Sequence, residues 1–159
     1  MPQALLVCQV RTPVHEVVDS ISMRIAFGAD EETCLTDALC NAMVELGHTC
    51  LWRARGQEWP EVGREVALAV ASGEAEFGVA CCWTGTGVAI AANKVGGIRA
   101  ALCVDAATAQ GARLWNDANV LALSIRLTSP EVGKEILEAF LSTASDDAEA
   151  GRIARIRPT

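Results

Sequence analysis

The sequence has few histidines, a shortage of basic residues and no long apolar run, and each shortage excludes a class of protein. Its 159 residues include only two histidines, His15 and His48, which lie far apart in the chain. No cysteine–histidine spacing matches a zinc site, and the adjacent residues Cys81 and Cys82 are poorly placed to share a tetrahedral metal. We therefore expect no bound metal.

Basic residues are outnumbered by acidic ones, 13 against 20, which gives a net charge of −7. This balance argues against nucleic acid or an acidic membrane as a partner, although local basic residues could still bind a small anion. No stretch reaches the ~18 uninterrupted apolar residues that a membrane span needs. With 51% hydrophobic and 21% charged residues, the chain can bury the core of one domain.

The first 22 residues differ from the rest of the chain. They have no basic start and no long apolar core, so they do not resemble a secretory signal. We therefore expect the seven cysteines to be reduced and the protein to be cytoplasmic. The stretch MRIAFGAD at 23–30 has the pattern of a strand that opens a domain. We interpret residues 1–22 as an N-terminal appendage and 23–159 as a single domain.

Predicted strands and helices alternate from Met23 onward. Continuous apolar runs predict strands at 24–28, 49–53, 77–82, 99–104 and 119–125. Helical spacing of apolar residues predicts helices at 31–46, 60–73, 88–93, 106–114, 130–141 and 146–156. Five buried strands separated by helices indicate an α/β fold, a three-layer α/β/α sandwich around a five-stranded, parallel, Rossmann-like sheet.

The expected strand order, 2-1-3-4-5, predicts where a ligand binds. In such sheets the site lies at the carboxyl ends of the strands, where the strand order reverses, which here falls between the first and third strands. Asp30 follows the first strand and Cys82 ends the third, so the two would face each other across this crevice. Asp30 could instead be only the N-cap of the following helix, which is the commoner role.

The loop Trp83-Thr84-Gly85-Thr86-Gly87 follows the third strand and opens a helix. Its glycines allow backbone N–H groups to turn toward a ligand, and the helix adds a partial positive charge, so the loop suits an anionic oxygen. A dinucleotide fingerprint is disfavoured, because its third small position is Ile90 and the loop does not follow the first strand. No Gly-Lys-Ser/Thr follows, which excludes a P-loop.

Cys82 has two interpretations. It could be a small buried hydrophobe, which is what we expect of the other six cysteines. Its position at the end of a strand, before a helix N-terminus, instead favours a thiolate. No histidine lies nearby to form a cysteine–histidine nucleophile, so a general base is the better hypothesis.

A longer stretch connects these features with a known family. The segment GVACCWTGTGVAIAANKVGGIRAALCVDAATAQGARLWNDANVLALSIR, residues 78–126, resembles the ribose-5-phosphate isomerase B and galactose-6-phosphate isomerase family. The resemblance covers about residues 23–156. It implies a parallel α/β/α fold and an assembly of dimers, or dimers of dimers, in which two subunits share each active site. It also implies interconversion of aldose and ketose phosphates through an enediolate, without cofactor or metal.

The resemblance assigns roles to individual residues. It identifies Cys82 as the base and Thr84 as a second catalytic residue. The substrate-binding residues are those that match the family's aspartate, oxyanion loop, asparagine motif and basic positions: Asp30, Gly85, Thr86, Gly87, Val88, Arg113, Trp115, Asn116, Arg152 and Arg155. A thiolate base and a cluster of N–H donors are the two groups that an enolisation needs.

Three positions depart from the family pattern. The histidine that opens the sugar ring is Trp115 here, the histidine after the first-strand aspartate is Glu31, and the first glycine of the loop is Trp83. The sequence therefore favours an isomerase for an open-chain sugar phosphate. A four-carbon phosphate would fit, because it cannot close a five-membered ring through its phosphorylated carbon. The alternatives are an isomerase or epimerase of a non-phosphorylated specialised metabolite, or an inactive ligand-binding homologue.

Overall fold

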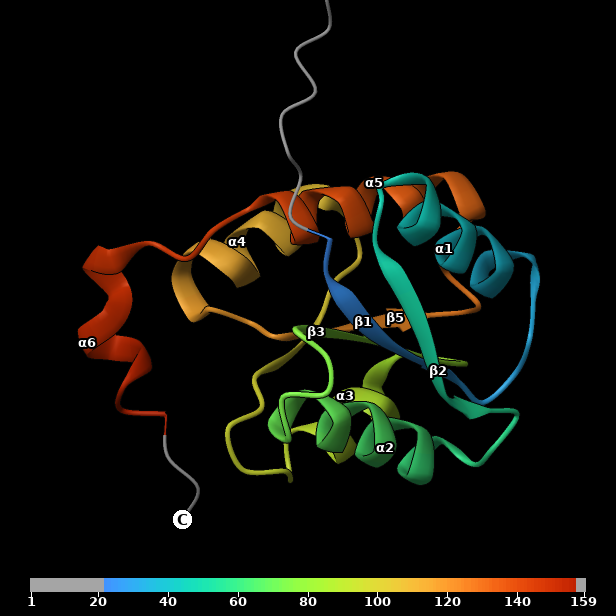
Figure 1. The fold of residues 1–159 in the computed structure, drawn as a ribbon, viewed down its shortest axis with the longest axis horizontal. Coiled ribbons are helices and arrows are strands. Elements are labelled where there is room, and N and C mark those ends of the chain that lie inside the picture. Colours follow the sequence, from blue (N-terminus) through green and yellow to red (C-terminus); the bar gives the residue numbers. More distant parts are fainter. Residues whose placement is uncertain (1–21, 157–159) are drawn as a thin grey trace, which may run out of the picture.

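The computed structural model describes residues 22–156, which form a five-stranded parallel sheet with helices on both faces (Figure 1). The predicted appendage, except for its last residue, lies outside the described residues. The strands are β1 (Arg24–Ala29), β2 (Thr49–Arg55), β3 (Phe77–Cys82), β4 (Ala100–Leu102) and β5 (Val120–Ser124). The helices are α1 (Cys34–Glu45), α2 (Trp59–Ala71), α3 (Thr86–Ala92), α4 (Ala106–Asn116), α5 (Pro130–Ser142), the 3-10 turn η1 (Asp147–Glu149) and α6 (Ala150–Ile153).

The three predicted layers are confirmed. Helices α1, α4 and α5 cover one face of the sheet, and α2 and α3 cover the other (Figure 1). Each face has its own apolar cluster, because successive side chains of a strand point to opposite faces. In β3, Val79 and Cys81 pack in the first cluster, and Ala80 and Cys82 pack in the second.

The strand order is 2-1-3-5-4, so the predicted order was wrong for the last two strands. β4 has only three residues, all partly exposed, and such a short strand suits the edge of a sheet. β5 is buried along its whole length and pairs with both β3 and β4. The reversal between β1 and β3 is as predicted, but the neighbour of Cys82 on its other side is Ser124 of β5.

Helix α1 begins three residues later than predicted. Its N-cap is Thr33, whose N–H donates to the hydroxyl of Thr36 at 2.8 Å. Asp30 is therefore not the cap of this helix, and the commoner interpretation of that residue was wrong. Two of the buried polar atoms without a hydrogen-bond partner among the described residues belong to this turn, Asp30 Oδ1 and Thr33 Oγ1.

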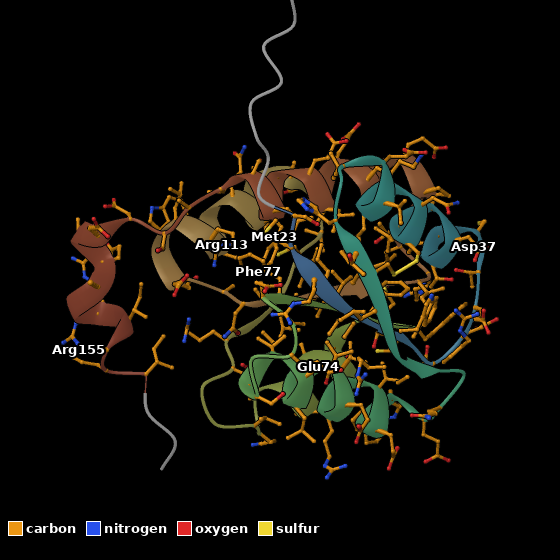
Figure 2. The ribbon with its side chains drawn as sticks, in the orientation of Figure 1. Met23, Asp37, Glu74, Phe77, Arg113 and Arg155 are labelled. Carbon is orange, nitrogen blue, oxygen red and sulfur yellow. A yellow bond between two sulfur atoms is a disulfide. The ribbon has the colours of Figure 1, made fainter. Side chains whose placement is uncertain are left out.

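The expectation that every thiol is reduced was also wrong. Cys40 of α1 and Cys50 of β2 form a disulfide, which Figure 2 shows between the helix and the strand. Their Cα atoms lie 5.8 Å apart, because α1 packs beside the edge strand β2. None of the helices in the described part of the chain has the length and apolarity that crossing a membrane requires.

Helix α6 stands apart from the three layers, beyond the amino ends of the strands (Figure 1). The segment that leads to it is tied to the end of α4, where the N–H of Asp146 donates to the carbonyl of Leu114 at 2.9 Å. The C-terminal residues are thereby placed at the opposite end of the sheet from the carboxyl ends of β1 and β3.

Candidate active site

The loop after β3 is held by the end of β5. Ile125 N–H donates to the carbonyl of Cys82 at 2.9 Å, and the hydroxyl of Ser124 donates to the carbonyl of Trp83 at 2.9 Å. The N–H of Arg126 also donates to Trp83, at 3.2 Å. These bonds fix the chain at the point where the strand becomes the loop, and they depend on β5 being the neighbour of β3.

Two glycines of the loop are required by close packing. Gly85 has a φ of 75°, and a Cβ there would lie 2.8 Å from the backbone of Leu123. At Gly87 a Cβ would lie 2.8 Å from the ring of Trp59, the first residue of α2. The loop is thus pressed between β5 and the Trp59 indole, and larger residues at either position would displace it.

The first turn of α3 leaves backbone donors free. The first helical bond formed is from Ala89 N–H to the carbonyl of Gly85. The N–H groups of Thr86, Gly87 and Val88 have no hydrogen-bond partner among residues 22–156. The hydroxyls of Thr84 and Thr86 lie 2.7 Å apart on the exposed side of the loop. This part of the site can donate hydrogen bonds to an anionic oxygen, as the sequence predicted.

Asp30 lies beside this loop, as predicted from its position after β1. Its N–H donates to the carbonyl of Cys81 at 3.2 Å. Burial raises the pKa of Asp30, a hydrogen bond from the Trp83 N–H opposes that rise, and the charge of Glu31 adds to it. One carboxylate oxygen, Oδ1, is nevertheless buried with no hydrogen-bond partner among residues 22–156. The structure therefore brings Asp30 and the loop after Cys82 together.

The free thiols differ in their surroundings. Cys81 faces the first apolar cluster, and burial raises its pKa far above the ordinary value of a thiol. Burial, with a smaller contribution from the charge of Asp105, raises the pKa of Cys103 to about 11. Both stay protonated at neutral pH. Cys82 is 3% exposed at the carboxyl end of β3, and Cys34 is exposed at the start of α1.

A cavity of about 640 Å³ opens next to Asp30. It is lined by the residues that follow β1 and β2: Asp30, Glu31, Gly56, Gln57, Glu58 and Trp59. Cys82 is not part of this lining, since it lies at the end of the strand behind Asp30 and the loop. The cavity extends from Asp30 to the Trp59 ring, which contacts the loop at Gly87.

Arg113 lies at the other end of the sheet, and its guanidinium forms hydrogen bonds within its own chain. Its Nε donates to the carbonyl of Thr143 at 3.1 Å, and its Nη1 donates to Asp117 Oδ1 at 2.8 Å and to the carbonyl of Ala118 at 2.6 Å. The guanidinium lies 4.7 Å from the ring centre of Phe77, the first residue of β3 (Figure 2). This arginine is 7% exposed and is not at the carboxyl ends with Asp30.

The other predicted residues also lie at the amino ends. Trp115 and Asn116 end α4, are exposed, and line a cavity of about 570 Å³ between α4 and β4. Arg152 pairs with Glu149, and Arg155 is exposed beyond α6 (Figure 2). The structure therefore divides the predicted site into two groups. The carboxyl-end group is Asp30, Cys82 and 84–88, and the amino-end group is Arg113, Trp115, Asn116, Arg152 and Arg155.

Sequence reasoning missed two residues at the carboxyl ends. Trp59 lines the cavity and touches the loop, and its only signal was a tryptophan directly before the proline that opens a helix. Arg126 is exposed after β5 and is joined to Trp83 through its backbone. With the predicted strand order, the end of β5 would not have been beside the loop, so Arg126 gave no signal.

Comparisons with known proteins agree with this fold. Residues 25–156 match the family model described as Ribose/Galactose Isomerase. Ribose-5-phosphate isomerase B of Escherichia coli (strain K12) is 40% identical over 123 residues, which cover 74% of this chain and 83% of that protein. D-erythrulose-4-phosphate isomerase of Pectobacterium atrosepticum is 47% identical over 83 residues, which cover 52% of this chain and 55% of that protein. A structure of Clostridium thermocellum ribose-5-phosphate isomerase B superposes with a TM-score of 0.80 at 33% identity, and the match covers 84% of this chain and 95% of that one.

Proposed function

Because this chain belongs to the ribose/galactose isomerase family, we propose that it is an aldose–ketose isomerase that converts a small sugar phosphate through an enediolate, with Cys82 as the base. The proposal rests on the arrangement at the carboxyl ends of β1 and β3. A thiol-bearing residue ends β3 directly before a loop with three N–H groups that have no partner among residues 22–156, and an open cavity lies next to Asp30, although Cys82 itself is not in its lining.

The proposed reaction removes a proton from one carbon, returns a proton to its neighbour and moves a proton between their two oxygens, with no change in overall oxidation state. The Cys82 thiolate removes the proton from the carbon next to the carbonyl; the electron pair of that C–H bond forms the carbon–carbon double bond, and the π electrons of the carbonyl move to its oxygen. The N–H groups of Thr86, Gly87 and Val88 hold the oxygen of the enediolate. The Cys82 thiol then returns the proton to the former carbonyl carbon, which leaves the carbonyl on its neighbour.

Thr84 and Asp30 have supporting roles in this proposal. The Thr84 hydroxyl, which contacts that of Thr86, moves protons between the two substrate oxygens. Asp30 is only partly buried and lines the cavity, so its carboxylate accepts a hydrogen bond from a substrate hydroxyl there. The Trp83 N–H lowers the pKa of Asp30 against the effect of burial, so the carboxylate also interacts with the start of the loop.

A second copy of the chain completes the proposed site. Trp115, Asn116, Arg152 and Arg155 lie at the amino ends of the strands, so they cannot surround a substrate bound at the carboxyl ends of the same subunit. In a homodimer or a dimer of dimers, a partner's amino-end group would face the carboxyl-end group. Arg113 is left out of the substrate contacts, because its guanidinium is used within its own subunit.

An open-chain substrate fits the residues present. Trp115 stands where the family has its ring-opening histidine, and it carries no group that protonates a ring oxygen. A four-carbon sugar phosphate that stays open does not need that histidine. Arg126 is an exposed cation beside the loop, with no ion pair among the described residues, and it offers a phosphate contact on the β5 side. Trp83 and Trp115 lie at opposite ends of the sheet, so they do not form an aromatic pocket within one subunit. The alternative of a non-phosphorylated substrate therefore lacks the support that such a pocket would give.

Solvent deuterium exchange into four-, five- and six-carbon sugar phosphates tests the proposal. The wild type should incorporate deuterium into at least one substrate, and Cys82→Ala should lower that rate by about 10³-fold, since a positioned base contributes about 10²–10⁴-fold. Cys34→Ala removes an exposed thiol outside the site and should leave the rate unchanged. Exchange that persists in Cys82→Ala would place the base elsewhere, and no exchange with any sugar phosphate would refute the activity.

A further inference from the structure

The single disulfide in the described part of the chain lies away from the candidate active site. It joins Cys40 of α1 to Cys50 of β2, which are ten residues apart in the sequence, and so it closes the corner where the chain leaves the helix and enters the strand. Cys50 is the second residue of β2, near the amino ends of the strands, whereas Asp30 and Cys82 lie at the carboxyl ends. Neither sulfur of the disulfide therefore takes part in the proposed reaction.

The strand β2 is weakly held by the rest of the fold. It is an edge strand bonded to β1 alone, and Ala54 is its only buried residue, whereas every residue of β3 after the first is buried. The ion pairs that Arg53 and Arg55 make from this strand are exposed, and exposed pairs contribute little to stability. A segment with so few buried contacts opens locally at low cost, so a covalent tie to α1 restrains it strongly.

The disulfide can be reached from solvent while the protein stays folded. Cys40 and Cys50 are both partly exposed. By contrast, three of the free thiols are buried: Cys81, Cys82 and Cys103. A thiolate must approach one sulfur of a disulfide in order to reduce it, so exposed disulfides are the labile ones. Because α1 still packs beside β2 when the bond is open, the two thiols remain close enough to form it again.

We propose that Cys40 and Cys50 form a reversible redox site that exchanges with low-molecular-weight thiols and disulfides of the glutathione class, and that its oxidised form clamps β2 to α1. In reduction, a thiolate attacks one protein sulfur and breaks the Cys40–Cys50 bond, which gives a mixed disulfide and one free protein thiolate. A second thiolate attacks the glutathione sulfur of the mixed disulfide and releases the other cysteine. Two thiols are thereby oxidised to one disulfide, and their two electrons and two protons end on the protein cysteines.

Thiol mapping in glutathione mixtures tests the exchange. The full chain is equilibrated in mixtures that run from oxidised to reduced glutathione, once from the oxidised and once from the reduced protein. Free thiols are then blocked with iodoacetamide, and the peptides are identified by mass spectrometry. The fraction of linked Cys40–Cys50 peptide should fall as the share of reduced glutathione rises, and the two starting points should converge. The buried thiols Cys81 and Cys103 should stay unlabelled, which shows that the protein remains folded. A linked peptide that never forms in oxidised glutathione, or one that survives reduced glutathione in the folded protein, would overturn the redox site.

Thermal unfolding tests the clamp. Reduction of the wild type should lower its unfolding midpoint by roughly 5–10 °C, because opening the loop returns conformational freedom to the unfolded chain. The double variant Cys40→Ser/Cys50→Ser should unfold at the lower temperature in both buffers. Cys34→Ser removes an exposed thiol outside the pair and should keep the wild-type difference.

Two results would refute the clamp. One is an equal midpoint for the oxidised and the reduced wild type, a comparison that needs no variant to fold. The other is a redox-dependent midpoint that remains in the folded double variant, since other thiols would then be responsible. Both measurements are independent of isomerase activity, so the redox site and the proposed function stand or fall separately.

Discussion

The polar groups at the two ends of the sheet are treated differently. At the amino ends, Arg113 uses its donors on Asp117, Ala118 and Thr143, and Asp117 also binds Arg99. At the carboxyl ends, Asp30 has a buried oxygen with no hydrogen-bond partner in the described part of the chain. Buried polar groups normally have hydrogen-bond partners, so one without a partner indicates a functional role rather than a structural one.

The difference teaches where stability and function lie in this chain. The Arg113 network joins the end of α4 to the residues just before β5 and just after α5, and so it stabilises the fold. The carboxyl ends instead hold free N–H groups, a half-exposed tryptophan and three carboxylates around one cavity. Such an arrangement costs stability in the free protein and gives binding groups to a ligand.

The largest effect is expected when two inactive variants, one altered at each end of the sheet, are combined in a mixed dimer. Cys82→Ala and Asn116→Ala alter opposite ends, and each should be inactive alone. In mixed dimers one of the two sites has neither change, so co-expression should restore roughly a quarter of the wild-type activity for random pairing. Deuterium exchange checks the result, and the purified, doubly tagged heterodimer, which has one intact site of two, should show roughly half of the wild-type rate.

A matched pair of variants makes this experiment decisive. Cys82→Ala combined with Asp30→Ala places both changes at the carboxyl ends, so every site of the mixed dimer carries one defect and no activity should return. Recovery with that pair, or failure of Cys82→Ala with Asn116→Ala to recover in a verified heterodimer, would show that the two ends do not form one site.

Much of the fold could be predicted because local patterns determine it. Apolar runs located the five strands within a few residues, and β3 was predicted without error. The order of β4 and β5 depends on pairing between distant segments, which no local pattern contains. The start of α1 was misplaced because Asp30 and Thr33 are both good N-caps, and only the backbone path after β1 decides between them.

The candidate site could be predicted only in part for a similar reason. Asp30 and the loop after Cys82 were brought together correctly, because both follow strands beside the reversal in strand order. Trp59 and Arg126 gave little signal, because their positions depend on the packing of α2 and on the place of β5. The amino-end residues were assigned to the same site by resemblance, but within one subunit they lie at the opposite end of the sheet from Asp30 and the loop.

The next largest effect concerns the amino ends. Arg113→Ala should lower the free energy of unfolding by about 2–3 kcal/mol, because it leaves the buried carbonyl of Ala118 and Oδ1 of Asp117 without their donor and removes the buried arginine side chain. Arg99→Ala breaks a more exposed pair with the same carboxylate and should cost about 1 kcal/mol. Urea unfolding with both midpoint and slope measured is the appropriate experiment. Equal losses in the two variants would mean that burial of Arg113 does not set its contribution.

The smallest effect should have the opposite sign and belongs to Asp30. Burial raises the pKa of its carboxyl in the folded state, so the folded protein holds this proton more tightly than the unfolded chain. Its contribution to stability therefore falls as the pH rises through the interval between the unfolded and folded pKa values, and the loss remains at neutral pH.

Asp30→Asn removes that penalty and should stabilise the protein at pH 7. The gain should be on the order of a few tenths of a kcal/mol, since the carboxyl is only partly buried and solvent screens it. The gain should shrink as the pH is lowered below the folded pKa, where the wild-type carboxyl is already neutral. Deuterium exchange by the same variant should decrease, because the amide offers a substrate hydroxyl a weaker acceptor than the carboxylate does. Thermal unfolding across the acidic range, with Asp37→Asn on the exposed side of α1 as the control, measures the effect. A loss of stability at pH 7 would mean that the Asp30 carboxylate helps to hold the loop in place, and the contrast between the two ends of the sheet would then fail at its central residue.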